Sequence, residues 1–394
     1  MIIELSEAQR ESQSGFRDFV DRLVAPFADE HDRRQEMPPE LIRQVAEAGY
    51  LGGVIPAQYG GSAMDAVTWG LLCEEIGRGS ASLLSLLIVH GMVAQALIKW
   101  GSEAQRQEWL PKLAKGEMIG AFGLTEPNIG SDARNIETTA VLEGDEWRLN
   151  GQKRWISFAQ VATLFLILAQ VDGKPAAFLV ERGRDGFSTE PINGMLGFRS
   201  AMLAGIHMQE CRIPAANLVG RVGFGFSHVA GTALDHGRYC VAWGCLGLAQ
   251  AGLDASLAYT GKRKQFGAFL KTHELIQELI ADMITQIRAA RMLCYQAAYL
   301  KQQGDPSLIM ETSIAKYFTS RVAVKVSSDA VQIHGANGCS DSYPVQRYLR
   351  DAKIMEIIEG SNQMQQIIIA KYGYQDHIMN QRRQRSENSG SKAE

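Results

Sequence analysis

The chain of 394 residues is 46% hydrophobic and 21% charged, and its formal net charge is −3. This length predicts two or three domains, because a single core of ordinary size accommodates fewer residues. The balanced charge shows no basic excess for nucleic acid, and no apolar run is long and uninterrupted enough to cross a bilayer, so we expect a protein that binds neither nucleic acid nor membrane.

Residues 1–117 carry a helical pattern. Apolar residues such as Phe16 and Phe19 recur every three or four positions, and the pattern is repeated several times. Ser102, followed three residues later by Gln105, matches the capping box that begins a helix. We therefore expect an all-helical N-terminal domain.

The pattern changes to short β-rich runs over 118–225. Runs such as 162–170 and 176–180 are bounded by turn residues, and Asn150-Gly151 is a hairpin signal. Because no helical pattern separates these runs, they predict an antiparallel β-barrel or sandwich as the middle domain.

Long helical patterns return in the last third of the chain. They cover 226–259, 273–303, 307–334 and the segment after Ser361. Together they predict a C-terminal four-helix bundle over 226–376. The polar and charged residues 377–394 predict a disordered tail. The expected fold class is therefore multidomain α+β, with helical, β and helical-bundle domains in that order.

The cysteines and histidines form no recognisable metal pattern. Six cysteines occur without a CxxC pair, and the eight histidines contain neither HExxH nor an i, i+4 pair. Scattered thiols are typical of a reducing compartment. The N-terminus also lacks the basic region and continuous apolar core of a signal peptide. The sequence therefore predicts no metal site and a cytoplasmic location.

Glu359 is the first candidate for a catalytic group. It lies between two helical apolar patterns and directly before Gly360, which permits a tight or left-handed turn. A loop between two helices can aim a carboxylate at a ligand. A solvated glutamate at the end of a helix gives the same local pattern.

The start of the middle domain supplies further candidates. Residues 122–132 read FGLTEPNIGSD, a loop that offers the Thr125 hydroxyl among turn residues. Trp155 lies beside Ser157 on a predicted strand edge, although a lone tryptophan is more often a core residue. Gly223-Phe224-Gly225 lacks a third glycine and a strand-turn-helix context, which disfavours a Rossmann dinucleotide site.

Taken in order, several motifs resemble those of the acyl-CoA dehydrogenase family of flavoproteins, over nearly the whole chain. LTEPNIGSD (124–132) is similar to the first family signature, and QIHGANGCSDSYPVQRYLRD (332–351) to the second, with Ala336 in place of its second glycine. RKQFG (263–267) resembles the segment that reaches the FAD of a neighbouring subunit. AKIMEIIEGSNQMQ (352–365) resembles the active-site loop.

The resemblance implies an FAD cofactor, an acyl-thioester substrate and Glu359 as the catalytic base. The residues implied in FAD binding are Phe122, Leu124, Thr125, Ser131, Trp155, Ser157, Arg263, Gln265, Phe266, Gln332, Gly335, Ala336, Ser361 and Gln363. Those implied in substrate binding are Ser131, Asp235, Arg238 and Gly360. Because Arg263 would reach a partner's cofactor, a homodimer or homotetramer is implied. An electron acceptor such as an electron-transfer flavoprotein is implied as well.

The implied reaction is the dehydrogenation of an acyl thioester. Glu359 removes the proton from the α-carbon, and hydride passes from the β-carbon to the flavin. Some family members place the base on another helix, directly before an arginine. That position is Gly237 in this chain, before Arg238, and glycine cannot abstract a proton.

Two questions stay open at this stage: the handle that carries the acyl group, and the reaction class. VAWGCLG (241–247) and MEIIEGSNQM (355–364) resemble dehydrogenases of polyketide and nonribosomal pathways, which oxidise acyl or aminoacyl groups on a carrier protein. The handle is therefore CoA or a carrier protein. The alternative functions are a flavin-dependent oxidase or monooxygenase on the same fold, and a non-catalytic helical interaction protein.

Overall fold

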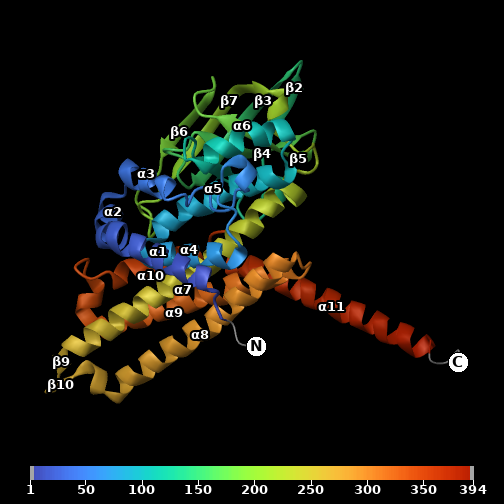
Figure 1. Cartoon of the computed structure of the whole chain (residues 1–394). Helices are drawn as coiled ribbons and strands as arrows, with labels where there is room; N and C mark the ends of the chain where they lie inside the picture. Colours follow the sequence, from blue (N-terminus) through green and yellow to red (C-terminus); the bar gives the residue numbers. More distant parts are fainter. Residues whose placement is uncertain (1–3, 391–394) are drawn as a thin grey trace.

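Residues 4–390 are described by a computed structural model. A helical N-terminal domain, a middle β-sheet domain and a helical C-terminal domain follow one another along the chain, as the sequence predicts (Figure 1). The helices form the lower layers in Figure 1, and the sheet lies on top of them.

Six helices account for most of the N-terminal domain in the described chain. They are α1 (Glu7–Leu23), α2 (Ala28–Arg34), α3 (Pro39–Glu47), α4 (Ala66–Gly79), α5 (Ala81–Trp100) and α6 (Glu103–Ala114). The predicted capping box at the start of α6 is confirmed, because the Ser102 hydroxyl accepts from the Gln105 backbone and the Gln105 side chain accepts from the Ser102 backbone. Helix α5 is long and apolar enough to cross a membrane, but 89% of its apolar window is buried within the protein, as expected for a core helix.

The middle domain is an eight-stranded sheet. Its strands are β1 (Gly120–Gly123), β2 (Thr139–Glu143), β3 (Glu146–Ile156), β4 (Leu164–Val171), β5 (Lys174–Glu181), β6 (Phe187–Pro191), β7 (Ala204–Pro214) and β8 (Leu218–Val219), in the order β6-β7-β3-β2-β4-β5-β8 with β1 beside β4. Most neighbours pair antiparallel, as predicted, but β1 pairs with β4 in parallel, and so does Thr139 of β2. The purely antiparallel prediction is corrected here, because β1 enters from helix α6 and not through a hairpin.

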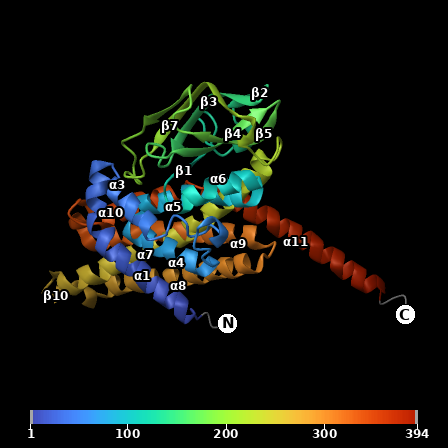
Figure 2. The ribbon, with the colours of Figure 1, turned by 45° about the horizontal axis from the view of Figure 1, so that its top comes forward.

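The buried His90 joins the sheet to the helices beneath it. The His90 ring lies with Nδ1 3.2 Å from Gly120 N of β1 and with Nε2 3.1 Å from the Leu113 carbonyl of α6. Burial lowers the pKa of His90 to about 4, so the ring is neutral and can accept from one backbone group and donate to the other. Figure 2 shows the resulting arrangement, with α5 and α6 between the sheet and the C-terminal helices.

The C-terminal domain is built from long helices. A π-helical turn (Gly225–Ala230) leads into α7 (Gly231–Lys262), and α8 (Glu274–Gln303), α9 (Leu308–His334), α10 (Val345–Met355) and α11 (Asn362–Gly390) follow, with a hairpin of β9 (Lys264–Gln265) and β10 (Ala268–Phe269) between α7 and α8. Helix α10 packs against α7 and α9. Helix α11 contacts α9 near its start and then extends away from the body (Figures 1 and 2). The segment after Ser361 therefore contributes only its first turns to the predicted bundle.

The predicted disordered tail is helical as far as Gly390, which corrects that expectation. Residues 377–390 continue α11 beyond the body, and the glutamines, arginines and glutamate in this stretch are good helix formers. The tail prediction for 391–394 lies outside the described residues.

Buried charges fix α10 to the rest of the molecule. Arg350 of α10 lies 2.5 Å from the Asp32 carboxylate of α2, and the Asp351 carboxylate accepts from the Phe198 backbone N–H at 2.8 Å. Burial raises the pKa of Asp351 to about 6, while Arg347 opposes that shift. The network connects the first, middle and last domains around the helix that precedes Glu359.

Candidate active site

Glu359 lies in the turn between α10 and α11, as predicted. Its φ of 54° and the φ of 84° at Gly360 place both residues in the left-handed region. For a non-glycine residue this conformation costs roughly 1–3 kcal/mol, so it persists only where the surroundings fix it. A backbone hydrogen bond from Asn362 N to the Glu356 carbonyl at 2.9 Å closes the turn. We call residues 356–362 the Glu359 loop.

The Glu359 carboxyl faces α7 in a site where it can act as a base. Burial raises its pKa to about 7; Arg238 and Lys316 pull the pKa down, and Cys240 pushes it up. Its Oε2 atom has no hydrogen-bond partner among the described residues. A carboxyl that titrates near neutrality and has a free oxygen matches a general base, and the solvated helix end considered above does not fit.

Gly237 of α7 makes room for this carboxyl. A Cβ atom built at position 237 would lie 2.2 Å from Glu359 Oε2, closer than any real contact. The two positions at which the family places its base therefore meet in space. This chain carries the carboxylate at one of them and glycine at the other.

Arg238 and Gly360, two of the four predicted substrate residues, lie beside Glu359. Arg238 donates from Nε toward the Glu359 carbonyl at 3.4 Å, and Gly360 is the next residue in the loop. Asp235 lies less than one turn before Arg238 on α7, and its buried Oδ1 has no partner within residues 4–390. The fourth, Ser131, lies in the exposed part of the loop after β1.

The Glu359 loop is held by residues that the sequence analysis missed. Lys316 of α9 donates from Nζ to the carbonyls of Glu356 at 3.3 Å and Gly360 at 3.1 Å, and to Asn362 Oδ1 at 3.1 Å. Gln365 Nε2 donates to the carbonyls of Glu359 at 3.2 Å and Gly360 at 2.9 Å. A lysine within the apolar periodicity of 307–334 was the available signal for a buried charge.

The candidate cofactor segments meet at the edge of the sheet. Phe122 and Leu124 are buried, and Thr125 accepts through its carbonyl from Arg154 N at 2.9 Å, which brings the 122–132 loop beside the end of β3. Trp155 follows with a left-handed φ of 62° and 44% exposure. The core position considered for this tryptophan is therefore wrong. The Arg154 guanidinium lies over the Trp155 ring, 4.6 Å from its centroid, and this exposed ring beside the partly buried Ser157 fits a flat group such as a flavin.

A second set of predicted cofactor residues lies elsewhere in the chain. Arg263, Gln265 and Phe266 are exposed on the β9–β10 hairpin, at the end of the bundle away from the sheet (Figures 1 and 2). The exposed residues Gln332, Gly335 and Ala336 lie at the end of α9. The chain does not bring the hairpin together with Trp155. Ser361 and Gln363 flank the start of α11, beside Glu359.

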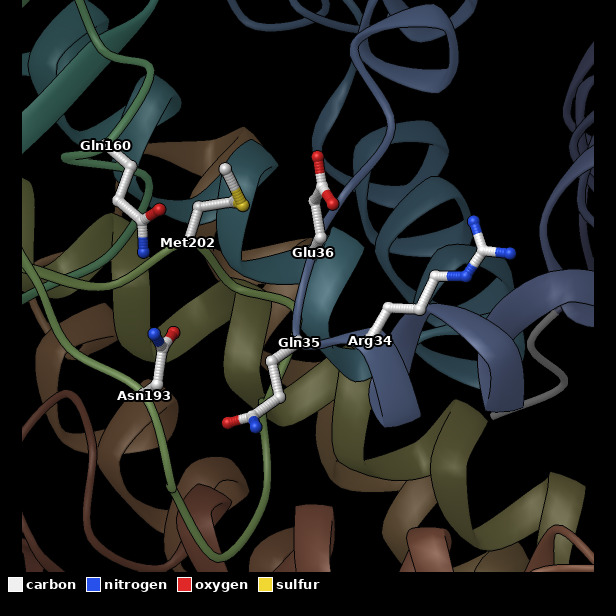
Figure 3. A pocket seen from close by; sticks show the side chains of 6 residues that line it. All are labelled: Arg34, Gln35, Glu36, Gln160, Asn193 and Met202. Carbon is white, nitrogen blue, oxygen red and sulfur yellow. The ribbon is translucent and has the colours of Figure 1, made fainter.

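A polar pocket of about 240 Å³ lies between the N-terminal and middle domains. Figure 3 shows Gln160, Asn193 and Met202 on one side and Arg34, Gln35 and Glu36 on the other. None of the predicted site residues lines it, although Gln160 is in the turn that follows Ser157.

Comparison with known proteins agrees with this geometry. The N-terminal, middle and C-terminal domains of acyl-CoA dehydrogenase match residues 6–117, 121–211 and 223–373. Probable acyl-CoA dehydrogenase YngJ of Bacillus subtilis is 38% identical over 94% of this chain and 99% of its own length. Butyryl-CoA dehydrogenase from Megasphaera elsdenii superposes with a TM-score of 0.91 at 35% identity, over 94% of this chain and 99% of that one.

A third relative is a solved acyl-CoA dehydrogenase of Bacillus anthracis complexed with FAD. It has a TM-score of 0.89 and 29% identity, over 96% of this chain and 68% of that one. The chain belongs to the acyl-CoA dehydrogenase family of FAD-dependent oxidoreductases.

Proposed function

We propose that this protein dehydrogenates an acyl-CoA thioester between its α- and β-carbons, with Glu359 as the base. The observation that carries the proposal is the buried Glu359 carboxyl, with its pKa raised to about 7 and an unpartnered oxygen. An α-proton of a thioester is weakly acidic, so its removal needs a positioned base that is deprotonated near neutral pH.

The other site residues bind and orient the flavin and the thioester. The loop over 122–132 and the exposed ring of Trp155 hold the flavin ring, and Arg238 and Gly360 border the position of the thioester. When bound, FAD accepts the hydride equivalent from the β-carbon. Glu359 takes the α-proton at its free Oε2, while its backbone N–H is assigned to the thioester carbonyl, where negative charge develops.

CoA is the proposed handle, because butyryl-CoA dehydrogenase is among the relatives that match over nearly their whole length. The experiment compares butyryl-CoA with a butyryl carrier protein under anaerobic conditions. Loss of the oxidised-flavin absorbance with butyryl-CoA supports the proposal. Reduction by the carrier-bound group alone would favour the biosynthetic alternative, rapid peroxide formation in air would favour an oxidase, and a protein that takes up no FAD would favour a non-catalytic role.

The proposal extends to the oligomeric state, the electron acceptor and the cellular location of the protein. The exposed Arg263 on the β9–β10 hairpin is suited to bind a partner's FAD pyrophosphate through paired, charge-assisted hydrogen bonds. The active unit is therefore at least a dimer, and an FAD-loaded active monomer in sedimentation would contradict this. We assign the role of electron acceptor to an electron-transfer flavoprotein. Electron transfer from the reduced enzyme to that protein tests this assignment.

We place the enzyme in the cytoplasm, since five of its six free cysteines are buried thiols, and fractionation of cells tests that location.

Trp155→Ala should weaken FAD binding about tenfold, because stacking contributes roughly 0.5–1.5 kcal/mol and 1.4 kcal/mol corresponds to a factor of ten. The measurement is the dissociation constant of FAD for the apoprotein. Tyr299→Ala is the matched control, since Tyr299 is another exposed aromatic residue, on α8. Equal affinity in Trp155→Ala and the wild type would contradict this placement of the ring.

Gly237→Ala should slow flavin reduction by about 10²-fold, since misplacing a catalytic group by about 1 Å has effects of that order. The new Cβ would lie 2.2 Å from Glu359 Oε2, so the carboxyl must move. Stopped-flow absorbance measures the rate. The control is Gly231→Ala on the same helix, where the nearest atom is 3.6 Å away. Similar rates in both variants would show that Glu359 does not need this space.

A further inference from the structure

Lys316 is a fully buried cation whose hydrogen bonds go to the Glu359 loop. Its side chain has no exposed surface, and Nζ donates to the carbonyls of Glu356 and Gly360 and to Asn362 Oδ1, at 3.1 to 3.3 Å. An ammonium group has three protons, so these acceptors use its full donor capacity. The acceptors lie on both sides of Glu359 in the chain.

Asn362 connects this cation to the rest of α9. Its Oδ1 also accepts from the Ser320 hydroxyl at 2.9 Å, and its Nδ2 donates to the Glu356 carboxylate at 3.3 Å. The Asn362 backbone N–H closes the loop on the Glu356 carbonyl. Lys316 and Ser320, one turn apart on α9, thus both donate to the Asn362 side chain of the loop.

Lys316 is charged although burial removes its ammonium group from water, which disfavours the charged form. Burial lowers its pKa to about 8, and Cys245, Glu359 and Glu356 raise it. An apolar side chain of similar length would avoid the desolvation of an ammonium group. A buried charge at such a position therefore indicates a role other than packing.

We propose that Lys316 is a positioning residue for the Glu359 base: with Asn362, its ammonium group fixes the Glu359 loop in the left-handed conformation that aims the carboxyl past Gly237. This inference rests on the proposed function for its catalytic meaning. The loop geometry itself can be tested without turnover.

The charge of Lys316 also affects the pKa of Glu359. The direction of this effect follows from the charged groups that face Glu359. These are Arg238 and Cys240 from α7 and Lys316 from α9. Both cations favour the carboxylate. Removing the Lys316 charge should raise the pKa of Glu359 above about 7, so that the base is protonated over a wider pH range.

The experiment uses Lys316→Met, Asn362→Ala and the control Lys325→Met in the FAD-loaded protein. Lys325 is an exposed lysine on the same helix, paired with Asp329. Hydrogen exchange is followed in a peptide that covers 356–362. We expect exchange at least about fivefold faster in Lys316→Met and Asn362→Ala, since each loses about 1 kcal/mol or more of loop hydrogen bonding. Lys325→Met should match the wild type.

The pH profile of flavin reduction separates positioning from general destabilisation. In Lys316→Met, the rising limb of the profile, where the rate increases with pH, should shift to higher pH by about one unit, as expected when a nearby opposite charge is removed. In Asn362→Ala, which keeps the charge, the limb should move less while the maximal rate falls. Unchanged hydrogen exchange and an unchanged rising limb in Lys316→Met would overturn the proposal. If Lys316→Met does not fold, unchanged exchange in Asn362→Ala would overturn it. A wild type that reduces no flavin with any acyl thioester would instead overturn the proposed function, and the exchange result would still decide the role of Lys316 in the loop.

Discussion

Glu359→Gln should lower the rate of flavin reduction by acyl-CoA by about 10²–10⁴-fold, the usual contribution of a general base. Glutamine keeps the size of the side chain and the backbone of the loop, so FAD content and folding should be unchanged. The second position used in the family supplies no substitute base, because it is Gly237, directly against the carboxyl. Anaerobic stopped-flow absorbance measures the rate.

The matched control is Glu356→Gln in the same loop. The Glu356 carboxylate accepts from Lys353 at 2.7 Å and Asn362 at 3.3 Å, and its substitution should cost far less than that of Glu359. Asp351 is unsuitable as a control, because its buried carboxylate holds the Phe198 backbone. A Glu359→Gln protein that reduces its flavin as fast as Glu356→Gln would show that the base is elsewhere.

Lys153→Met should destabilise the middle domain by about 3–5 kcal/mol, the usual cost of leaving one partner of a buried ion pair uncompensated. Lys153 Nζ lies 2.7 Å from Glu126 Oε1, and both side chains are buried. Lys153 also donates to the Leu124 carbonyl at 3.3 Å, so its loss frees the 122–132 loop and should lower FAD content. Urea unfolding monitored by circular dichroism, together with flavin content, measures both effects.

Adding Glu126→Gln to Lys153→Met should recover part of the lost stability. Burial favours the protonated form of Glu126, but Lys153 and the hydrogen bonds from Thr138 and Glu137 outweigh it and lower its pKa, so Lys153→Met leaves a carboxyl whose charge burial then disfavours. The amide of glutamine removes that charge and can still accept from Thr138. If the double variant were less stable than Lys153→Met by the full cost of a second deletion, the two residues would be acting independently.

The long periodic elements could be predicted from the sequence with good boundaries. Patterns over 273–303 and 307–334 correspond to α8 at Glu274–Gln303 and α9 at Leu308–His334, because a helix with one buried face must repeat its apolar residues. The parallel pairing of β1 with β4 was not predictable in this way, since it depends on a contact between distant segments. The helical continuation of α11 was missed because composition alone suggested disorder.

The candidate site shows the same division between local and long-range information. The Glu359-Gly360 turn follows from local pattern, and the family resemblance supplied a role for it. The buried state of its carboxyl, the space left at Gly237 and the bonds from Lys316 depend on α7 and α9, which are far away in the sequence. A lysine within an apolar helical pattern can indicate a buried charge, but neither it nor the glycine indicates which distant segment it contacts.

The assignment of Glu359 as the base depends on its protonation state, which makes the pH dependence of anaerobic flavin reduction the decisive measurement. In the wild type, we expect the rate to rise with pH around the Glu359 pKa of about 7, because only the carboxylate can accept the α-proton. In Glu359→Gln, the small remaining rate should not change over the same range. A wild-type rate that is independent of pH there, or the same rising limb in Glu359→Gln, would contradict the assignment.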